Sequence, residues 1–301
     1  MHAVRSTVAP RRETDPAPGA PSRRALLRTA GLLALTPVAA CAGATGARPP
    51  AAATTPPRRL PPPRAQRARA PEEPDAKPPE PAPGPRTPPP APPPPVRPRP
   101  FARLPRAGHA LALTFDDGPD PRWTPEVLAV LAAHDVRATF FVCGRQAAKH
   151  PALLRRITEA GHLVGNHTWD HRRLTGLGRA AVEEQIARTS ETVRRATGRA
   201  PAWFRAPYGE WDRTVYMLGA RHGMEPLAWS VDTEDWSRPG AAAITRRVLA
   251  GARPGAVVLC HDGGGDRAQT VTALRRFLPR LRADGWDLVR PDRRLTRGAA
   301  R

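Results

Sequence analysis

The first hundred residues of this 301-residue chain contain no phenylalanine, tyrosine or tryptophan. More than half of the 40 prolines in the chain lie between Pro49 and Pro100. This composition supplies too little apolar surface for a packed core and favours an extended, disordered polyproline segment. Every aromatic residue lies from Phe101 onward, in a stretch long enough to form one domain with a sizeable core.

Acidic residues are also in short supply, and the formal net charge is +21. Residues 1–100 carry 16 basic and 6 acidic side chains, and residues 101–301 carry 32 and 21. Such an excess favours polyanionic surroundings, for example nucleic acid, anionic wall polymers or lipid headgroups. Arginines spread over a solvated surface account for the same charge without any partner, and we prefer this explanation.

The apolar run near the N-terminus is too short to cross a bilayer as a permanent helix. A twin-arginine segment, "SRRALLR" at Ser22–Arg28, precedes the apolar run Thr29–Ala40, which ends at Cys41. This order is typical of a signal peptide. The ending "VAAC" resembles a bacterial lipobox, in which Cys41 would become the lipidated first residue. We therefore predict an exported protein, lipid-anchored to the membrane and facing the cell wall; cleavage of an ordinary signal is the alternative.

Cysteine is scarce, with three residues in the chain. Apart from Cys41, the chain has Cys143 and Cys260, each at the end of an apolar run. Export permits a disulfide, but we expect two buried free thiols. The chain thus divides into a signal peptide (1–41), a Pro/Ala/Arg-rich disordered linker (42–104), a folded domain (105–295) and a short C-terminal tail (296–301).

Within the domain, short apolar runs alternate with amphipathic segments. The predicted strands are residues 110–115, 138–142, 162–165, 202–205, 226–231, 256–260 and 286–289. The predicted helices are residues 125–133, 151–160, 179–197, 211–222, 241–250 and 268–283. This alternation predicts a parallel sheet covered by helices. The pattern alone fits both a doubly wound sheet and a barrel-like closure.

Unusual polar clusters follow five of the predicted strands. They are the pair Asp116–Asp117 and the segments "NHTWDH", "APYG", "DTEDW" and "HDGGGD". In both architectures the site lies at the carboxyl ends of the strands. We therefore expect these clusters to converge in space.

The residue types in these clusters indicate metal chemistry. His167 and His171 are four residues apart, a spacing that places both rings on one face of a helical turn. With a carboxylate from a neighbouring strand, they would form the two-histidine, one-carboxylate set of a catalytic zinc site. One member of the Asp116–Asp117 pair then serves as a ligand, and the other is free to act as a base.

Other polar residues complete a hydrolytic site. His261 titrates near neutrality and suits a general acid, and Arg205 suits a carboxylate partner. Asp235 is suited to orient a histidine or an arginine. The turn at Tyr208–Gly209 would expose backbone N–H groups to a developing oxyanion. Together these residues predict metal-assisted hydrolysis of an acyl group.

Five segments in this order, "TFDDGP", "HTWDH", "RAPYG", "DTEDW" and "LCH", resemble the motifs of the polysaccharide deacetylases (carbohydrate esterase family 4, the NodB-homology domain). The resemblance covers roughly residues 108–292. It implies a distorted (β/α)7 barrel with parallel strands. It also implies a divalent metal, usually Zn²⁺ with Co²⁺ or another divalent ion possible, and hydrolytic removal of acetyl groups from polymer sugars.

The resemblance also assigns roles to residues. It makes Asp116 the catalytic base, tethered by Arg205, and Asp117 a metal ligand together with His167 and His171. It makes His261 the proton donor to the leaving amine, oriented by Asp235. The residues that it places at the substrate are Pro207, Tyr208, Trp236 and Leu259, with Tyr208 donating a backbone N–H.

The resulting expectation is a monomeric deacetylase of N-acetylated glycans. Peptidoglycan is the first choice of substrate because an anchored domain on a long spacer would face the cell's own wall. A chitooligosaccharide deacetylase and an acetylxylan esterase are the alternatives within the same chemistry. A wall-binding module without catalysis would lack a ligand or the base, and neither is missing. Nucleic-acid binding fits the charge but not the predicted export.

Overall fold

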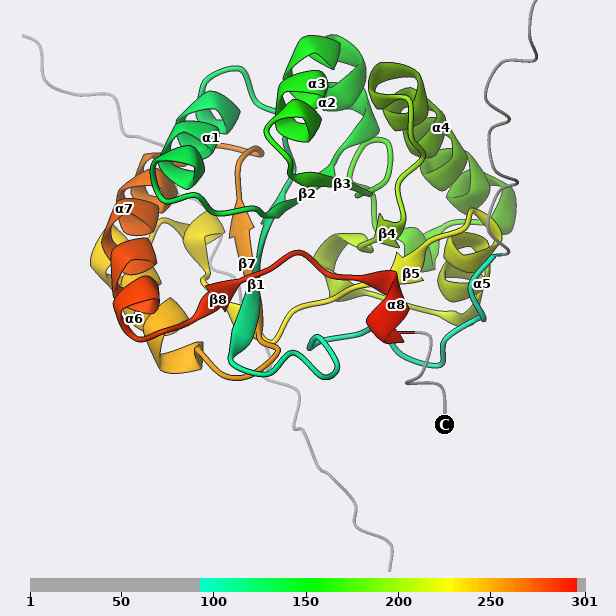
Figure 1. The fold of residues 1–301 in the computed structure, drawn as a ribbon. Coiled ribbons are helices and arrows are strands. Elements are labelled where there is room, and N and C mark those ends of the chain that lie inside the picture. The colour runs from blue at the N-terminus through cyan, green and yellow to red at the C-terminus, as the bar shows by residue number, and fades with distance from the viewer. Residues whose placement is uncertain (1–92, 297–301) are drawn as a thin grey trace, which may run out of the picture. The chain divides into compact units, whose positions relative to one another are not determined.

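The computed structural model describes residues 93–296 (Figure 1). The predicted signal peptide, Cys41, most of the predicted linker and the last five residues lie outside this range. The predictions of export, lipidation and domain division therefore stay predictions. Within the described part of the chain, no helix combines the length and the apolar character needed to cross a membrane.

The domain is built on a parallel sheet. Its strands are β1 (Ala110–Asp116), β2 (Thr139–Val142), β3 (Leu163–Asn166), β4 (Trp203–Phe204), β5 (Glu225–Pro226), β6 (Val231–Asp232), β7 (Val257–His261) and β8 (Asp287–Leu288). The strand order is β5-β4-β3-β2-β1-β7-β6, and β8 pairs with the start of β1. All of these pairings are parallel. The long central strand β1 thus lies in the middle of the sheet.

Helices connect the strands and surround the sheet (Figure 1). They are α1 (Trp123–Ala133), α2 (Gly144–Lys149), α3 (Pro151–Glu159), α4 (Arg179–Thr197), α5 (Arg213–Arg221), α6 (Ala241–Gly251), α7 (Ala268–Ala283) and α8 (Arg293–Thr296). Three 3-10 turns, at Leu174–Gly176, Pro207–Gly209 and Asp235–Ser237, lie in the loops. Parallel strands need such long crossovers, and the helices cover the apolar outer face of the sheet.

The connection between β5 and β6 requires the sheet to curl. These two strands lie at opposite ends of the strand order but are joined by residues 227–230 alone. An extended chain from residue 226 to residue 231 reaches about 18 Å. A flat sheet of this order would hold its edge strands about 29 Å apart. The sheet is therefore a curled, open barrel, which confirms the predicted distorted (β/α)7 architecture.

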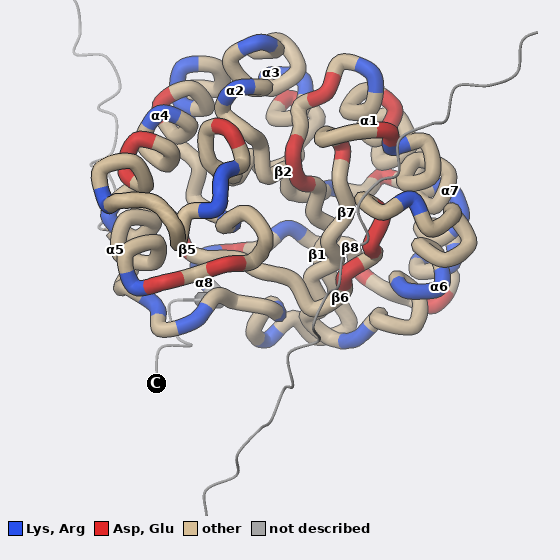
Figure 2. Tube along the Cα trace, turned by 180° about the vertical axis from the view of Figure 1, so that it is seen from behind, with Lys and Arg blue, Asp and Glu red and all other residues tan. Residues whose placement is uncertain are grey.

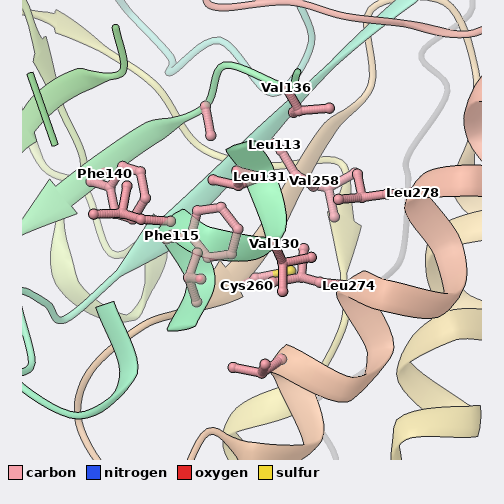
Figure 3. Packing of buried hydrophobic residues seen from close by; sticks show 14 of the residues in the cluster. Leu113, Phe115, Val130, Leu131, Val136, Phe140, Val258, Cys260, Leu274 and Leu278 are labelled. Carbon is pink, nitrogen blue, oxygen red and sulfur yellow. The ribbon is translucent and has the colours of Figure 1, made fainter. Parts of the chain in front are cut away.

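The two faces of β1 serve different parts of the domain. Leu111, Leu113 and Phe115 pack outward into the main hydrophobic core with residues of α1 and α7 (Figure 3). The alternate residues Thr114 and Asp116 are also buried, and both contact the Arg205 side chain. The two-residue period of a strand thus directs apolar side chains to the helices and polar ones to the barrel interior.

Basic residues are distributed over the outer helices rather than gathered on one face. Figure 2 shows Lys and Arg positions on α4, α5, α6 and α7, and acidic positions on α4 and in the loops between the elements. Several of these arginines pair with nearby carboxylates, such as Arg194 and Arg195 with Glu191. This distribution agrees with the reading of the positive charge as solvated surface arginine.

One predicted strand differs from the structure, and the short helices α2 and α8 were not predicted. The apolar run predicted as one strand over residues 226–231 forms two short strands, β5 and β6, and between them the carbonyls of Leu227 and Ala228 accept hydrogen bonds from Arg205. The short helix α2 was not predicted, since its six residues show no apolar periodicity. Cys143 and Cys260 are both buried free thiols, as expected.

The segment before the first strand is attached to the sheet. Arg97, in the segment predicted as linker, forms a buried ion pair with Glu225 of β5, with Nη2 2.8 Å from Oε1 and Nε 2.9 Å from Oε2. Phe101 donates its N–H to the Pro226 carbonyl at 2.9 Å, and its own carbonyl accepts the N–H of Ala228 at 2.9 Å. Residues 97–101 therefore cover the edge of the sheet at β5.

Replacing Arg97 by alanine should destabilise the domain. The change leaves the Glu225 carboxylate buried without this partner, and breaking a buried pair costs about 3–5 kcal/mol. Arg99 is exposed and is the matched control; its alanine variant should stay within about 0.5 kcal/mol of wild type. Urea unfolding of both variants measures the difference. Equal free energies of unfolding for the two variants would show that the ion pair does not hold this segment to the domain.

Candidate active site

Three predicted ligands meet at the carboxyl end of the sheet. Asp117 follows β1, while His167 and His171 follow β3. One carboxylate oxygen and one ring nitrogen from each histidine lie within 4.8 Å of one another. The Nε2 atoms of His167 and His171 are 3.6 and 3.4 Å from Asp117 Oδ1. The structure therefore brings together the ligand set that the sequence analysis proposed.

The two adjacent aspartates have different surroundings. Asp116 is the last residue of β1 and keeps the strand's inward orientation, with Oδ1 2.7 Å from Arg205 Nη1. Its second oxygen, Oδ2, lies 3.5 Å from His167 Nε2. Asp117 leaves the strand with a φ of 72°, in the left-handed region. This change of backbone direction lets two consecutive carboxylates reach the same cluster from different sides.

His167 is prepared for metal binding by burial and by its hydrogen bond. Its Nδ1 donates to the Arg205 carbonyl at 2.7 Å, so the Nε2 lone pair faces the cluster. Burial lowers the pKa of His167 to about 3, and the nearby Asp117 charge only partly opposes this. The imidazole is therefore neutral at physiological pH, which is the form that binds a metal.

The segment between the two histidines is not the helical turn that their spacing suggested. Residues 167–171 form an irregular turn in which Thr168 and His171 have φ values of 66° and 62°. The two imidazole rings nevertheless lie 4.9 Å apart between centroids. The four-residue spacing correctly predicted their proximity, although the helical reason for it was wrong.

Arg205 is the partner that was predicted for Asp116, and both side chains are almost completely buried. Burial raises the pKa of the Asp116 carboxyl, and the attraction of Arg205 limits the rise. The Arg205 guanidinium also donates to the Thr114 hydroxyl at 2.9 Å. Asp116 is thus a carboxylate held beside the ligand cluster whose proton affinity is higher than that of an exposed aspartate.

His261 and Asp235 form a second polar pair. His261 Nδ1 lies 2.6 Å from Asp235 Oδ1, and the His261 backbone N–H donates to Asp235 Oδ2 at 2.9 Å. Burial alone would lower the pKa of His261, but the hydrogen bond and charge of Asp235 outweigh it and raise that pKa to about 9. Thr270 also donates to Asp235 Oδ2 at 2.7 Å. The pair therefore keeps a protonated imidazole with its Nε2 atom not engaged by Asp235.

The four predicted substrate residues differ in exposure. Pro207 is buried and Leu259 is 4% exposed, whereas Tyr208 and Trp236 are 56% and 59% exposed. The Tyr208 ring packs edge-on against His171 at a centroid distance of 4.8 Å. Tyr208 has a φ of 60°, within the turn that follows Arg205. Trp236 adjoins Asp235 in the 3-10 turn, so two exposed aromatic side chains accompany the polar pairs.

One buried acidic residue at this edge escaped the sequence analysis. Asp262 follows His261 and is completely buried, and its Oδ2 accepts a hydrogen bond from the Thr124 hydroxyl at 2.5 Å. Burial raises the pKa of Asp262 to about 7. A side chain at Gly118 would overlap the Asp262 carboxyl, with its Cβ 2.3 Å from Oδ2. The position of Asp262 directly after His261 in "LCHDGGG" was the available signal.

The donor set suits a divalent cation. Two imidazoles and one carboxylate are the ligands of many catalytic zinc sites, which keep a further position for water or substrate. The hydrogen bond from His167 Nδ1 to a backbone carbonyl orients that ligand as outer partners do in metal sites. The residues therefore fit a metal, flanked by a candidate base, Asp116, and a candidate acid, His261.

Comparisons with known proteins agree with this chemistry. A family model described as "Polysaccharide deacetylase" matches residues 104–227. A chitooligosaccharide deacetylase from Sinorhizobium fredii is 45% identical over 197 residues, covering 61% of this chain and 92% of that protein. A peptidoglycan N-acetylglucosamine deacetylase from Listeria monocytogenes is 42% identical over 182 residues, covering 60% of this chain and 38% of that protein.

Solved structures show the same fold. The structure of the Bc1960 peptidoglycan N-acetylglucosamine deacetylase, in complex with a hydroxamate-type benzamide, superposes with a TM-score of 0.61 at 38% identity. The match covers 63% of this chain and 89% of that chain. The fold of this domain is thus shared with a solved peptidoglycan deacetylase structure.

The His261–Asp235 pair generates a titration prediction. In wild type, His261 should titrate near pH 9, as its raised pKa indicates. The Asp235→Asn change removes the largest contributions that raise this pKa, while burial and the charges of Asp116 and Asp117 remain, so His261 should then titrate at a lower pH than in wild type. NMR titration of the imidazole in metal-free protein measures both values. An unchanged pKa in the variant would contradict the role given to Asp235.

Proposed function

The chain belongs to the polysaccharide deacetylase family, and we propose that it removes acetyl groups from the N-acetylglucosamine residues of peptidoglycan. The observation that carries the proposal is the cluster of Asp117, His167 and His171 beside two buried polar pairs, Asp116–Arg205 and Asp235–His261. One pair contains a base and the other an acid, which hydrolysis of an amide requires on its two sides. We assign the metal as Zn²⁺ because two of the three donors are imidazoles.

Asp117, His167 and His171 would hold a divalent cation, which when bound would supply Lewis acidity for the acetyl carbonyl and the attacking water. In the first step Asp116 accepts a proton from water as the water oxygen bonds to the carbonyl carbon. Arg205 holds the Asp116 carboxylate through a hydrogen bond to Oδ1. The other oxygen, Oδ2, therefore faces the ligand cluster. The backbone N–H of Tyr208 is the proposed donor to the developing oxyanion.

In the second step the carbon–nitrogen bond breaks. The protonated His261 donates its Nε2 proton to the amide nitrogen, which leaves as the amine, while the acyl carbon becomes acetate. Asp235 binds the opposite ring nitrogen and so fixes the ring orientation and the charge of the imidazole. General acid and base groups of this kind typically contribute about 10²–10⁴-fold each.

Peptidoglycan is the proposed polymer for two reasons. Tyr208 and Trp236 are more than half exposed beside the polar pairs, which suits sugar rings of a chain lying across an open site. The predicted export signal and linker would present the domain to a cell wall. A chitooligosaccharide is the second candidate, because the Sinorhizobium chitooligosaccharide deacetylase aligns over 92% of its own length.

Acetate release tests the proposal directly. The full exported chain should release acetate from peptidoglycan, and chelator should abolish the release until Zn²⁺ is restored. Chitooligosaccharides and acetylxylan serve as parallel substrates. Faster release from chitooligosaccharides would replace the proposed polymer with the second candidate. Release that persists at full rate after complete metal removal would contradict the metal-dependent chemistry.

The paired aspartates should fail in different ways. Asp116→Asn keeps the side-chain shape but cannot accept the proton, so metal content should remain and kcat should fall at least about 10²–10⁴-fold. Asp117→Asn removes a charged ligand, so metal binding should weaken and activity should recover partly with excess Zn²⁺. Metal analysis beside residual activity distinguishes the two variants. Metal loss in Asp116→Asn together with metal retention in Asp117→Asn would mean that the roles are exchanged.

A further inference from the structure

The turn that carries the two histidine ligands has an unfavourable backbone. Thr168 and His171 both lie in the left-handed region, with φ of 66° and 62°, and neither is a glycine. This conformation is unfavourable for residues that carry a Cβ and persists only where the surroundings hold it. The contacts that hold this turn therefore determine where His171 lies relative to His167 and Asp117.

Three consecutive backbone N–H groups of the turn are bound by side-chain amides. Asn166 Oδ1 accepts the N–H of Thr168 at 2.8 Å. Gln185 Oε1 accepts the next two, from Trp169 at 3.0 Å and from Asp170 at 3.1 Å. A single oxygen of Gln185 thus holds the two residues that directly precede His171.

The opposite side of the turn is bound as well. The carbonyls of Thr168 and Trp169 accept the N–H groups of Gly144 and Arg145, at 2.9 and 2.8 Å, from the first turn of α2. A Cβ at Gly144 would lie 2.5 Å from the Trp169 ring and 2.4 Å from the Thr189 hydroxyl. The turn is therefore held between α2 and α4 with little space to move.

Helix α4 supplies the fixed points of this arrangement. Gln185 is 7% exposed and projects from α4 fourteen positions beyond His171. On the same helix, the Asn166 side chain donates to the carbonyl of the next residue, Ile186, at 2.8 Å and to the Ser190 hydroxyl at 2.9 Å. The long helix α4 thus determines the position of the turn through Asn166 and Gln185.

We propose that Gln185 is a positioning residue for the metal site, which sets the reach of His171 by holding the N–H groups of Trp169 and Asp170. The proposal rests on the proposed function, because it takes Asp117, His167 and His171 as the ligands. Partners outside the ligand set are often worth about 10–100-fold in metal affinity. Gln185 would affect metal affinity through the backbone of the turn, because it does not touch a ligand side chain.

The chain offers variants that isolate this role. Gln185→Met keeps length and helix propensity but removes the acceptor, and Gln185→Ala is a second variant without it. Gln185→Glu keeps an oxygen able to accept both N–H groups. Gln269→Met is the matched control, because Gln269 Oε1 also accepts a backbone N–H, that of Gly240 at 2.7 Å, which directly precedes helix α6.

Competition with a chromophoric chelator measures the Zn²⁺ dissociation constant of each full-length variant, and the Co²⁺ absorption spectrum reports ligand geometry. Gln185→Met and Gln185→Ala should bind Zn²⁺ about 10–100-fold more weakly than wild type, with an altered Co²⁺ spectrum. Gln185→Glu should remain close to wild type. Gln269→Met should keep wild-type affinity, even if its melting temperature falls as much as that of Gln185→Met.

The results separate failure of this inference from failure of the proposed function. His171→Ala is the reference and should lose the metal. If it does, and Gln185→Met binds Zn²⁺ as wild type does, the positioning role is overturned while the ligand assignment stands. Failure of Gln185→Glu to restore affinity, or an equal loss in Gln269→Met, also overturns it. Wild-type affinity in His171→Ala would overturn the ligand assignment and this inference together.

Discussion

The buried ion pair between Arg205 and Asp116 is the interaction on which the site depends. Arg205 is completely inaccessible to solvent and lies between the rings of Phe141 and Trp229, 4.2 and 5.6 Å from their centroids. Its guanidinium donates to Thr114 and Asp116 of β1 and to the carbonyls of Leu227 and Ala228. A buried cation without such partners would cost several kcal/mol. The barrel interior is therefore built around this one side chain.

Several features of the domain follow from that placement. Arg205 binds the carbonyls of Leu227 and Ala228, which lie in the short segment through which the chain crosses from β5 to β6 in the curled sheet. Because it binds only one oxygen of Asp116, the other oxygen faces the histidines. The neighbouring Asp117 leaves the strand and completes the ligand cluster. The contact between Arg205 and Asp116 thus belongs both to the barrel interior and to the candidate active site.

Sequence reasoning predicted the features that depend on local patterns. Continuous apolar runs indicated parallel strands, and polar residues directly after them marked the site, with Asp116, His167 and His261 at or beside strand ends. The break between β5 and β6 could not be predicted, because "PLAWSV" has the composition of one strand and the residues that bind its middle, Arg205 and Phe101, are distant in sequence. The same holds for Gln185, whose partners become neighbours only through folding. Arg97 lies in a proline-rich segment that was predicted as a linker, so its ion pair with Glu225 was not predicted.

A crystal structure of the protein grown with Zn²⁺, with anomalous diffraction data recorded at the zinc edge, tests the central claim most directly. The account predicts one strong anomalous peak that marks a Zn²⁺ ion bonded to Asp117 Oδ1, His167 Nε2 and His171 Nε2. Asp116 should remain in its ion pair with Arg205 and should not be bonded to the ion. A peak bonded to Asp116, with Asp117 turned away or Arg205 released from the barrel interior, would contradict it.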